Sequence, residues 1–174
     1  MNVTTIQHPW QHYLIDDFLP ESDYQHLLDW FSEQPAMNDE QRKNSDGRWK
    51  DDRYPKSITE PLYTSFLEVM SYTQCTKPGI VSYQLDKMLP NECDYPTHCD
   101  SFHKIASLVL YVGEPNRGTF IHASDTKEPL YEVEWKENRA FFFIVQQGVS
   151  WHSFHNQGTT TPRCTALINL RQYA

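Results

Sequence analysis

The stretch Tyr95-Pro-Thr-His-Cys-Asp100 sets a histidine and a carboxylate two positions apart, and this spacing determines the fold that we expect. Side chains at positions i and i+2 of a β-strand point to the same face. His98 and Asp100 can therefore grip one metal ion while Cys99 points away. A third ligand can come from another strand, at His152 in the stretch Val149-Ser-Trp-His-Ser-Phe154.

Two imidazoles and one carboxylate on one face of an ion leave its remaining positions open. This donor set is typical of non-haem Fe(II), which must bind a cosubstrate and dioxygen together. Arg163 follows His152 after a connecting turn, and its planar guanidinium can hold a carboxylate through two parallel hydrogen bonds. The four residues predict an iron site with a clamp for the far carboxylate of 2-oxoglutarate. Arg171, eight residues further along the same final segment, is expected to lie beyond the pocket.

The C-terminal half of the chain, residues 79–171, has the pattern of short strands separated by turns. The segment Lys104–Val112 is apolar on both of its alternating faces, so both should be covered. Regularly spaced strands favour a β-sandwich or barrel. Together with the metal spacing they predict a mainly β fold, a double-stranded β-helix or jelly roll with the site in its mouth. The predicted strands are 80–87, 104–112, 119–123, 131–135, 139–145, 149–155 and 163–170.

The preceding part, about residues 13–75, is expected to be largely helical. After Pro20, the residues Tyr24, Leu27, Leu28 and Phe31 recur at helical spacing and predict an amphipathic helix that packs on the sheet. A second helix is predicted from residue 59 to 72, with Thr59 as its N-cap.

The segment 34–56 between these helices is polar, charged and without periodicity, so we expect a long loop. Loops of this length in a compact domain often act as lids or binding elements. Arg48, Trp49 and Arg53 would then be candidate substrate contacts. A plain surface loop is the alternative.

Length and charge favour one enzyme domain over residues 1–174 and exclude some partners. The net charge of −8 argues against a general nucleic-acid binder. The sequence contains neither a membrane-length apolar run nor a signal peptide, so we expect a cytoplasmic protein without membrane association. The four cysteines form no disulfide or zinc pattern and should be free thiols. The oligomeric state is left open.

These motifs resemble the 2-oxoglutarate- and Fe(II)-dependent oxygenases, in particular their prolyl-hydroxylase-like branch. Three further stretches are similar to this branch: Leu14-Ile-Asp-Asp-Phe-Leu-Pro20 to its opening strand and turn, Leu108–Val112 to the strand after His-x-Asp, and 138–143 to the strand before the distal histidine. The resemblance implies that His98, Asp100 and His152 are the metal ligands and that Arg163 is the clamp. It also implies that Tyr111 hydrogen-bonds the same carboxylate.

The implied enzyme is a dioxygenase that hydroxylates a C–H bond of a peptide side chain or a small metabolite. It would consume 2-oxoglutarate and O2, release succinate and CO2, and use ascorbate as a candidate reductant. The chain departs from the family at Met88, where some relatives have a second cosubstrate-binding tyrosine, and at Gly118, which stands alone where a glycine pair is common. The connection from His152 to Arg163 is also longer than in several relatives.

Two other functions use the same residues. A zinc-dependent hydrolase could hold its ion with His98, Asp100 and His152, although Arg163 would then have no role. A non-catalytic jelly-roll binding module is the second alternative.

The other histidines have simpler expected roles. His155 competes with His152 as a ligand, but a residue three positions along a strand faces the other side. His103 is expected in a solvated loop, and His122 in the pocket wall or on the outer surface. His8, His12 and His26 are expected on the surface.

Overall fold

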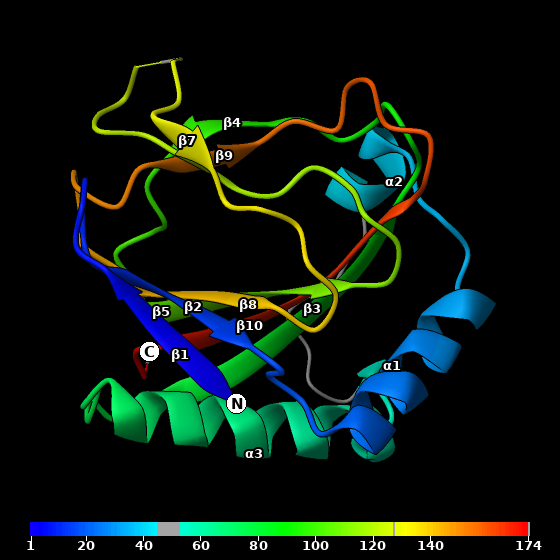
Figure 1. Ribbon diagram of the computed structural model, residues 1–174, viewed down its shortest axis with the longest axis horizontal. Helices are drawn as coiled ribbons and strands as arrows, with labels where there is room; N and C mark the ends of the chain where they lie inside the picture. The colour runs from blue at the N-terminus through cyan, green and yellow to red at the C-terminus, as the bar shows by residue number, and fades with distance from the viewer. Residues whose placement is uncertain (45–52, 127, 174) are drawn as a thin grey trace.

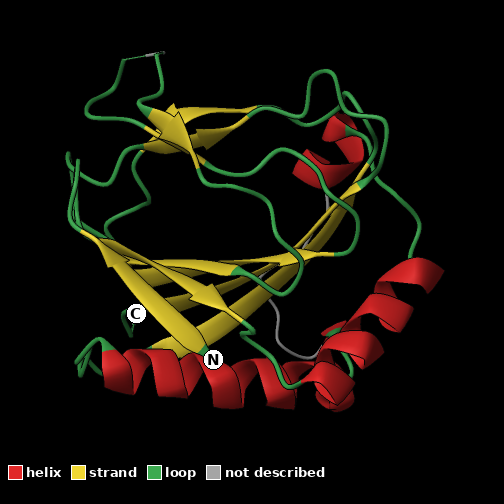
Figure 2. Cartoon of the chain, viewed as in Figure 1, coloured by secondary structure: helices red, strands yellow, loops and turns green. Residues whose placement is uncertain are grey.

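Two antiparallel β-sheets face each other, and helices cover the outer side of the larger sheet (Figure 1 and Figure 2). The computed structural model describes residues 1–44, 53–126 and 128–173. The larger sheet has the strand order β1 (Asn2–Ile6), β2 (His12–Asp16), β8 (Ala140–Ile144), β5 (Lys104–Val112), β10 (Arg163–Arg171) and β3 (Ile80–Met88). The smaller sheet has the order β4 (Tyr95–His98), β9 (His152–Phe154), β6 (Phe120–Ile121) and β7 (Tyr131–Glu132). The helices are α1 (Glu21–Glu33), α2 (Asp39–Asn44) and α3 (Lys56–Tyr72).

Strand β5 is apolar on both faces because it lies inside the larger sheet, with β8 on one side and β10 on the other. Ala106, Leu108 and Leu110 belong to a core cluster shared with α1 and α3. On the opposite face, Val109 and Tyr111 join a second cluster of largely aromatic residues between the sheets. The predicted burial of both faces is confirmed.

Helix α1 begins directly after Pro20, as predicted, and buries Tyr24, Leu27 and Phe31. Helix α3 runs along the outer face of the larger sheet (Figure 2). The prediction of its start was wrong: it begins at Lys56, with Pro55 at the N-cap position. Thr59 is already inside the helix, where its hydroxyl faces the Pro55 carbonyl at 3.5 Å. Pro55 allows the earlier start because a proline at this edge loses no helical hydrogen bond.

The described residues of the segment 34–56 differ from the long loop that we predicted. It contains α2, and Met37 forms a parallel bridge to Met88. Tyr54 is buried and its hydroxyl accepts a hydrogen bond from the Leu85 N–H at 3.1 Å. Arg53 is exposed beside the Tyr54 ring. The predicted contacts Arg48 and Trp49 lie outside the described residues.

The N-terminal residues extend the larger sheet by two strands. The resemblance implied the second, β2, whereas β1 has no alternating apolar pattern and was not predicted. Three strands of the smaller sheet, β6, β7 and β9, are shorter than expected because turns take up the ends of their segments. In the part of the chain that the structure describes, no helix has the length and apolar character needed to cross a membrane.

Candidate metal centre and its cavity

A cavity of about 430 Å³ lies between the two sheets. Strands β3, β5 and β10 contribute one wall, and residues of β4, β9 and the turn after β4 contribute the other. The lining of the cavity includes two histidines, a tyrosine and a cysteine. It also carries five charged side chains: Asp86, Asp100, Lys104, Arg163 and Arg171.

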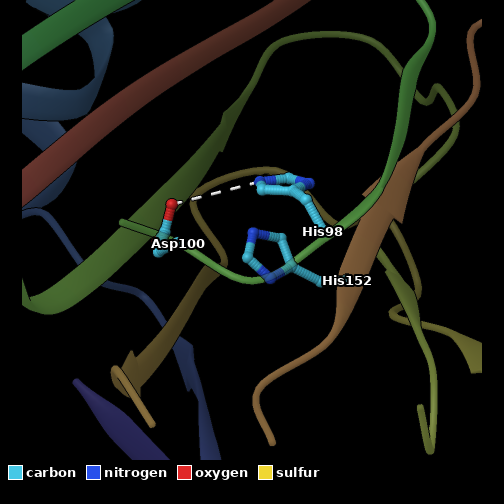
Figure 3. A group of neighbouring side chains, drawn as sticks. All are labelled: His98, Asp100 and His152. Carbon is cyan, nitrogen blue, oxygen red and sulfur yellow. Dashed lines mark ion pairs between the residues drawn. The ribbon is translucent and has the colours of Figure 1, made fainter. Parts of the chain in front are cut away.

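His98, Asp100 and His152 converge in this cavity, and Figure 3 shows their side chains pointing toward one another. One nitrogen or oxygen of each lies within 4.8 Å of those of the other two. The two histidines are directly opposite each other in the β4–β9 pair. Together with Asp100, they form the one group with metal-ligand geometry that is found among the described residues.

Asp100 lies beside His98 in the ligand group, as predicted, but the two residues are not on the same strand. Strand β4 ends at His98, so Asp100 lies in the turn that follows and not on the same strand. Its position is held from outside β4: Gln147 donates to the Asp100 carbonyl at 2.7 Å. Cys99 is outside the ligand group, as expected, but it also lines the cavity.

Both imidazoles are fixed in the same tautomer by the main chain. His98 Nδ1 is 2.9 Å from the Pro96 carbonyl and His152 Nδ1 is 3.0 Å from the Ser150 carbonyl, each two residues back. Only a protonated Nδ1 can donate to a carbonyl, so Nε2 of each ring keeps its lone pair for an ion. Such contacts orient the rings before any ion binds.

The Asp100 carboxylate is held by two side chains from β5. Lys104 Nζ donates to Oδ1 at 2.6 Å, and the Ser107 hydroxyl donates to Oδ2 at 2.5 Å. Asn169 on β10 contacts the same hydroxyl at 2.9 Å. Each carboxylate oxygen has a further lone pair, so these contacts orient Asp100 while leaving it able to ligate an ion.

The protonation states suit metal binding. Burial lowers the pKa of His152 to about 4, with the neighbouring His98 acting in the same direction. Burial also lowers the pKa of His98. For Asp100, burial alone would raise the pKa, but the charges of Lys104 and His152 and the hydrogen bonds from Lys104 and Ser107 lower it overall. At neutral pH the site therefore presents two neutral imidazoles and one carboxylate, which is the form that binds metal.

The donor set fits a divalent transition metal. Two cis ligands bonded to one ion at about 2.0–2.2 Å lie about 3 Å apart. His98 Nε2 and Asp100 Oδ1 are 4.0 Å apart, and all three ligand atoms lie within 4.8 Å of one another, so ion binding would draw them together by about 1–2 Å. Neutral imidazole and carboxylate ligands on one side, with an open cavity on the other, match the arrangement used by non-haem Fe(II).

Arg163 lies in the same cavity and is only 2% exposed. Its guanidinium carbon is 4.4 Å from the centre of the Phe154 ring and 5.6 Å from that of Trp135. Phe154 follows His152 by two positions on β9, so the guanidinium sits one side chain deeper than the metal group. Arg163 donates hydrogen bonds to two neutral groups, the Arg117 carbonyl and the Thr165 hydroxyl, both at 3.4 Å.

Tyr111 is fully buried next to this arginine but does not line the cavity. Its hydroxyl donates to Thr119 Oγ1 at 2.9 Å and accepts from the Thr119 N–H at 3.0 Å. Thr119 does line the cavity, so it presents the polar group that the sequence assigned to Tyr111. Met88 is directly opposite Arg163 in the β3–β10 pair, at the place where some relatives have a tyrosine.

Three charged residues of the cavity wall were not predicted as site residues: Asp86, Lys104 and Arg171. Arg171 was expected to lie beyond the pocket, which is wrong. It pairs with Lys104 at the ends of β10 and β5 and lines the cavity with it. The alternation of inward and outward residues along β10 could have indicated this, because Arg163 and Arg171 are an even number of positions apart.

The remaining histidines follow the predictions with two exceptions. His155 is outside the metal group and lies 3.6 Å from Asp94, while His8, His26 and His103 are exposed. His12, expected on the surface, is fully buried between the Trp10 carbonyl and the Tyr131 hydroxyl. His122 is also fully buried and contacts Ser153 at 2.8 Å, so it is part of neither the cavity wall nor the surface. All four cysteines are free thiols.

Solved structures of two prolyl hydroxylases superpose on nearly the whole chain. A prolyl-4-hydroxylase from Pseudomonas putida matches with a TM-score of 0.65 and 13% identity, over 94% of this chain and 93% of that chain. A prolyl hydroxylase from Trichoplax adhaerens, solved with a hypoxia inducible factor peptide fragment, matches with a TM-score of 0.64 and 11% identity, over 92% of this chain and 83% of that one.

The chain has a prolyl-hydroxylase-like fold. No protein-family profile matches its sequence. No curated protein matches it either. At 13% and 11% identity, the likeness to these two structures concerns the arrangement of the backbone.

Proposed function

We propose that this chain is a 2-oxoglutarate- and Fe(II)-dependent dioxygenase that hydroxylates a C–H bond of a peptide side chain or a small metabolite. One observation carries the proposal: a group of two histidines and one aspartate shares one cavity with a deeply buried arginine. A metal site explains the first part and a bound carboxylate explains the second. A cosubstrate that joins the two, with a metal-chelating end and a distal carboxylate, explains both together.

The strand order supports a double-stranded β-helix. From β3 to β10 the chain passes back and forth between the two sheets, so that β3, β10, β5 and β8 are neighbours in one sheet and β4, β9, β6 and β7 in the other. A jelly roll built in this way places its ligand between the sheets. We propose that residues 1–174 act as one catalytic unit of this kind.

In this proposal the Nε2 atoms of His98 and His152 and one Asp100 oxygen hold Fe(II). When bound, Fe(II) with 2-oxoglutarate and O2 would supply the oxidative decarboxylation that yields succinate and CO2 and oxidises the substrate C–H bond. The chain contributes binding and orientation. Lys104 and Ser107 fix the carboxylate, and the Pro96 and Ser150 carbonyls fix the imidazoles.

Arg163 would bind the distal carboxylate of 2-oxoglutarate. Burial of a guanidinium among Phe154, Trp135 and Thr165 is costly without an anion, and a carboxylate with two hydrogen bonds compensates best. Thr119, which is held by Tyr111, would add a neutral hydroxyl nearby. The apolar side chains of Val109, Leu167 and Phe143 along the same wall would exclude water from the bound cosubstrate.

The shared cavity of the metal group and Arg163 also weighs against the two alternative functions, the zinc-dependent hydrolase and the non-catalytic binding module. A zinc-dependent hydrolase needs the three ligands and a water, but it has no use for a buried arginine one side chain deeper in the cavity. A non-catalytic module would not need two imidazoles held in the same ligand-ready tautomer.

The test is anaerobic addition of Fe(II) and then 2-oxoglutarate to the purified protein. We expect a metal-to-ligand charge-transfer absorption that appears only with both, followed in air by succinate release, with ascorbate included as reductant. The Asp100→Ala variant is the matched control and should show neither. Absence of the band in the wild-type protein at saturating Fe(II) would contradict the proposal.

A further inference from the structure

A second basic site lies at the opposite end of the cavity from Arg163. Arg163 and Arg171 are the first and last residues of β10, so their Cα atoms are about 25 Å apart at the usual rise of a strand. Arg171 is directly opposite Lys104, the first residue of β5. Both side chains line the cavity, and Lys104 contacts Asp100 of the metal group at 2.6 Å.

This end of the cavity is held in place by the main chain. The Gln172 N–H donates to the His103 carbonyl at 2.8 Å, and the Lys104 N–H donates to the Ser101 carbonyl at 2.9 Å. These bonds tie the end of β10 to the turn that carries Asp100. Arg171 and Lys104 therefore keep a fixed position relative to the metal group, on the side away from Arg163.

The charges of the cavity wall favour an anionic substrate. Among the described residues that line the cavity there are three cations, Lys104, Arg163 and Arg171, and two carboxylates, Asp86 and Asp100. A divalent ion and the 2-oxoglutarate dianion add no net charge to this set. At the end of the cavity away from Arg163, the two cations Lys104 and Arg171 lie beside one carboxylate, Asp100, which would be a metal ligand, so this end suits an anionic group of the substrate.

We infer that the substrate of this chain carries a carboxylate, and that Arg171 and Lys104 bind it beside the metal group. This inference rests on the proposed dioxygenase function and specifies its substrate class. The occupant is a free amino acid, an acylated amino acid or a peptide with its terminal carboxylate in the cavity. An arginine and a lysine on neighbouring strand ends give a carboxylate both a planar fork and a point charge.

The inference can be tested with pairs of compounds that differ only in charge. N-acetyl amino acids and their amides, for proline, leucine, lysine, glutamine and phenylalanine, are titrated anaerobically into protein loaded with Fe(II) and 2-oxoglutarate. Binding is followed by the shift of the charge-transfer band. We expect at least one acid to bind about tenfold or more tightly than its amide, because the acid gains charge-assisted hydrogen bonds.

The variant Arg171→Gln should remove most of this preference for the acid, while 2-oxoglutarate affinity stays within about twofold of wild type. Lys136→Gln is the control, because Lys136 is an exposed cation that does not line the cavity. It should keep the full preference.

Each contrary outcome has a distinct meaning. A normal band with equal binding of acids and amides, or with no binding up to about 10 mM, would overturn the substrate class and leave the dioxygenase proposal intact. An acid preference that survives in Arg171→Gln would overturn the assigned residues. A large loss of 2-oxoglutarate affinity in Arg171→Gln would instead assign this arginine to the cosubstrate. No band at all would remove the dioxygenase proposal and this inference with it.

Discussion

At the residue scale, the metal group depends on the three side chains of His98, Asp100 and His152. Asp100→Ala should lower the affinity for Fe(II) or Mn(II) by at least about a hundredfold, since even residues that only support a ligand cost 10- to 100-fold. His155→Ala should leave it nearly unchanged, because His155 is outside the group. Isothermal titration with Mn(II) measures both. Equal losses of metal affinity in the two variants would show that His155 also contributes to the metal site, and that the choice of His152 alone was wrong.

Arg163 allows a graded test of the clamp. Arg163→Lys keeps the charge but loses the planar fork, and Arg163→Ala loses both. The affinity for 2-oxoglutarate should fall in the order wild type, Lys, Ala, with a total loss of roughly tenfold or more. Metal affinity should barely change in either variant. Lys136→Ala serves as the control, because Lys136 is exposed and does not line the cavity. An unchanged 2-oxoglutarate affinity in Arg163→Ala would refute the clamp.

Asp86 is an acidic residue in a place where the cosubstrate would bring another negative charge. It is opposite Thr165 in the β3–β10 pair, lines the cavity and interacts electrostatically with Arg163. Asp86→Asn should tighten 2-oxoglutarate binding by roughly threefold to tenfold, because like charges several ångströms apart repel in a partly enclosed site. Asp94→Asn, an exposed change outside the cavity, should have no such effect. Weaker binding in Asp86→Asn would mean that Asp86 helps to hold Arg163 in place.

At the element scale, His12 joins the larger sheet to the smaller one. It belongs to β2, and its ring contacts the Tyr131 hydroxyl at the start of β7. Burial lowers its pKa from 6.5, and the bond to the Trp10 carbonyl opposes this only in part. The folded protein therefore keeps His12 neutral at a pH where the unfolded chain is already protonated.

This difference predicts how stability depends on pH. Below pH 6.5 the unfolded state binds a proton at His12 that the folded state does not, so the free energy of unfolding falls as pH decreases toward the folded pKa. His12→Gln should destabilise the protein at pH 7.5, but the gap to wild type should narrow as the pH falls from 7.5 to 5.5. Urea unfolding of the metal-free protein at both pH values measures this. His8→Gln is the exposed control, and a gap of constant size would contradict the role of His12.

At the scale of the whole molecule, the metal group and Arg163 connect the two sheets through bound ligands. Metal and cosubstrate bind only the folded chain, so they should stabilise it by mass action. Mn(II) alone at about 100 times its dissociation constant should add about 2.7 kcal/mol. For a chain of this size that corresponds to a rise in Tm of roughly 5–10 °C. Asp100→Ala should show almost no rise with Mn(II), and a full rise in that variant would place the metal elsewhere.

The sequence by itself determined the features that depend on local patterns. The apolar alternation of β5, the amphipathic face of α1 and the residue types of the metal group can all be read within a few positions of the chain. They are local because side-chain direction follows the period of a strand or a helix. Arg163 was also found in this way, since it begins a strand with a clear alternating pattern.

Only the tertiary structure decided which distant side chains share the cavity. The contact of Ser107 with Asn169, the pairing of Arg171 with Lys104, and the burial of His12 each require two segments to meet. Sequence periodicity indicates which face of a strand a residue occupies, but strand order and register decide what that face meets. For this reason the metal ligands and the inward face of β10 could be predicted from the sequence, whereas the meeting of Arg171 with Lys104 could not.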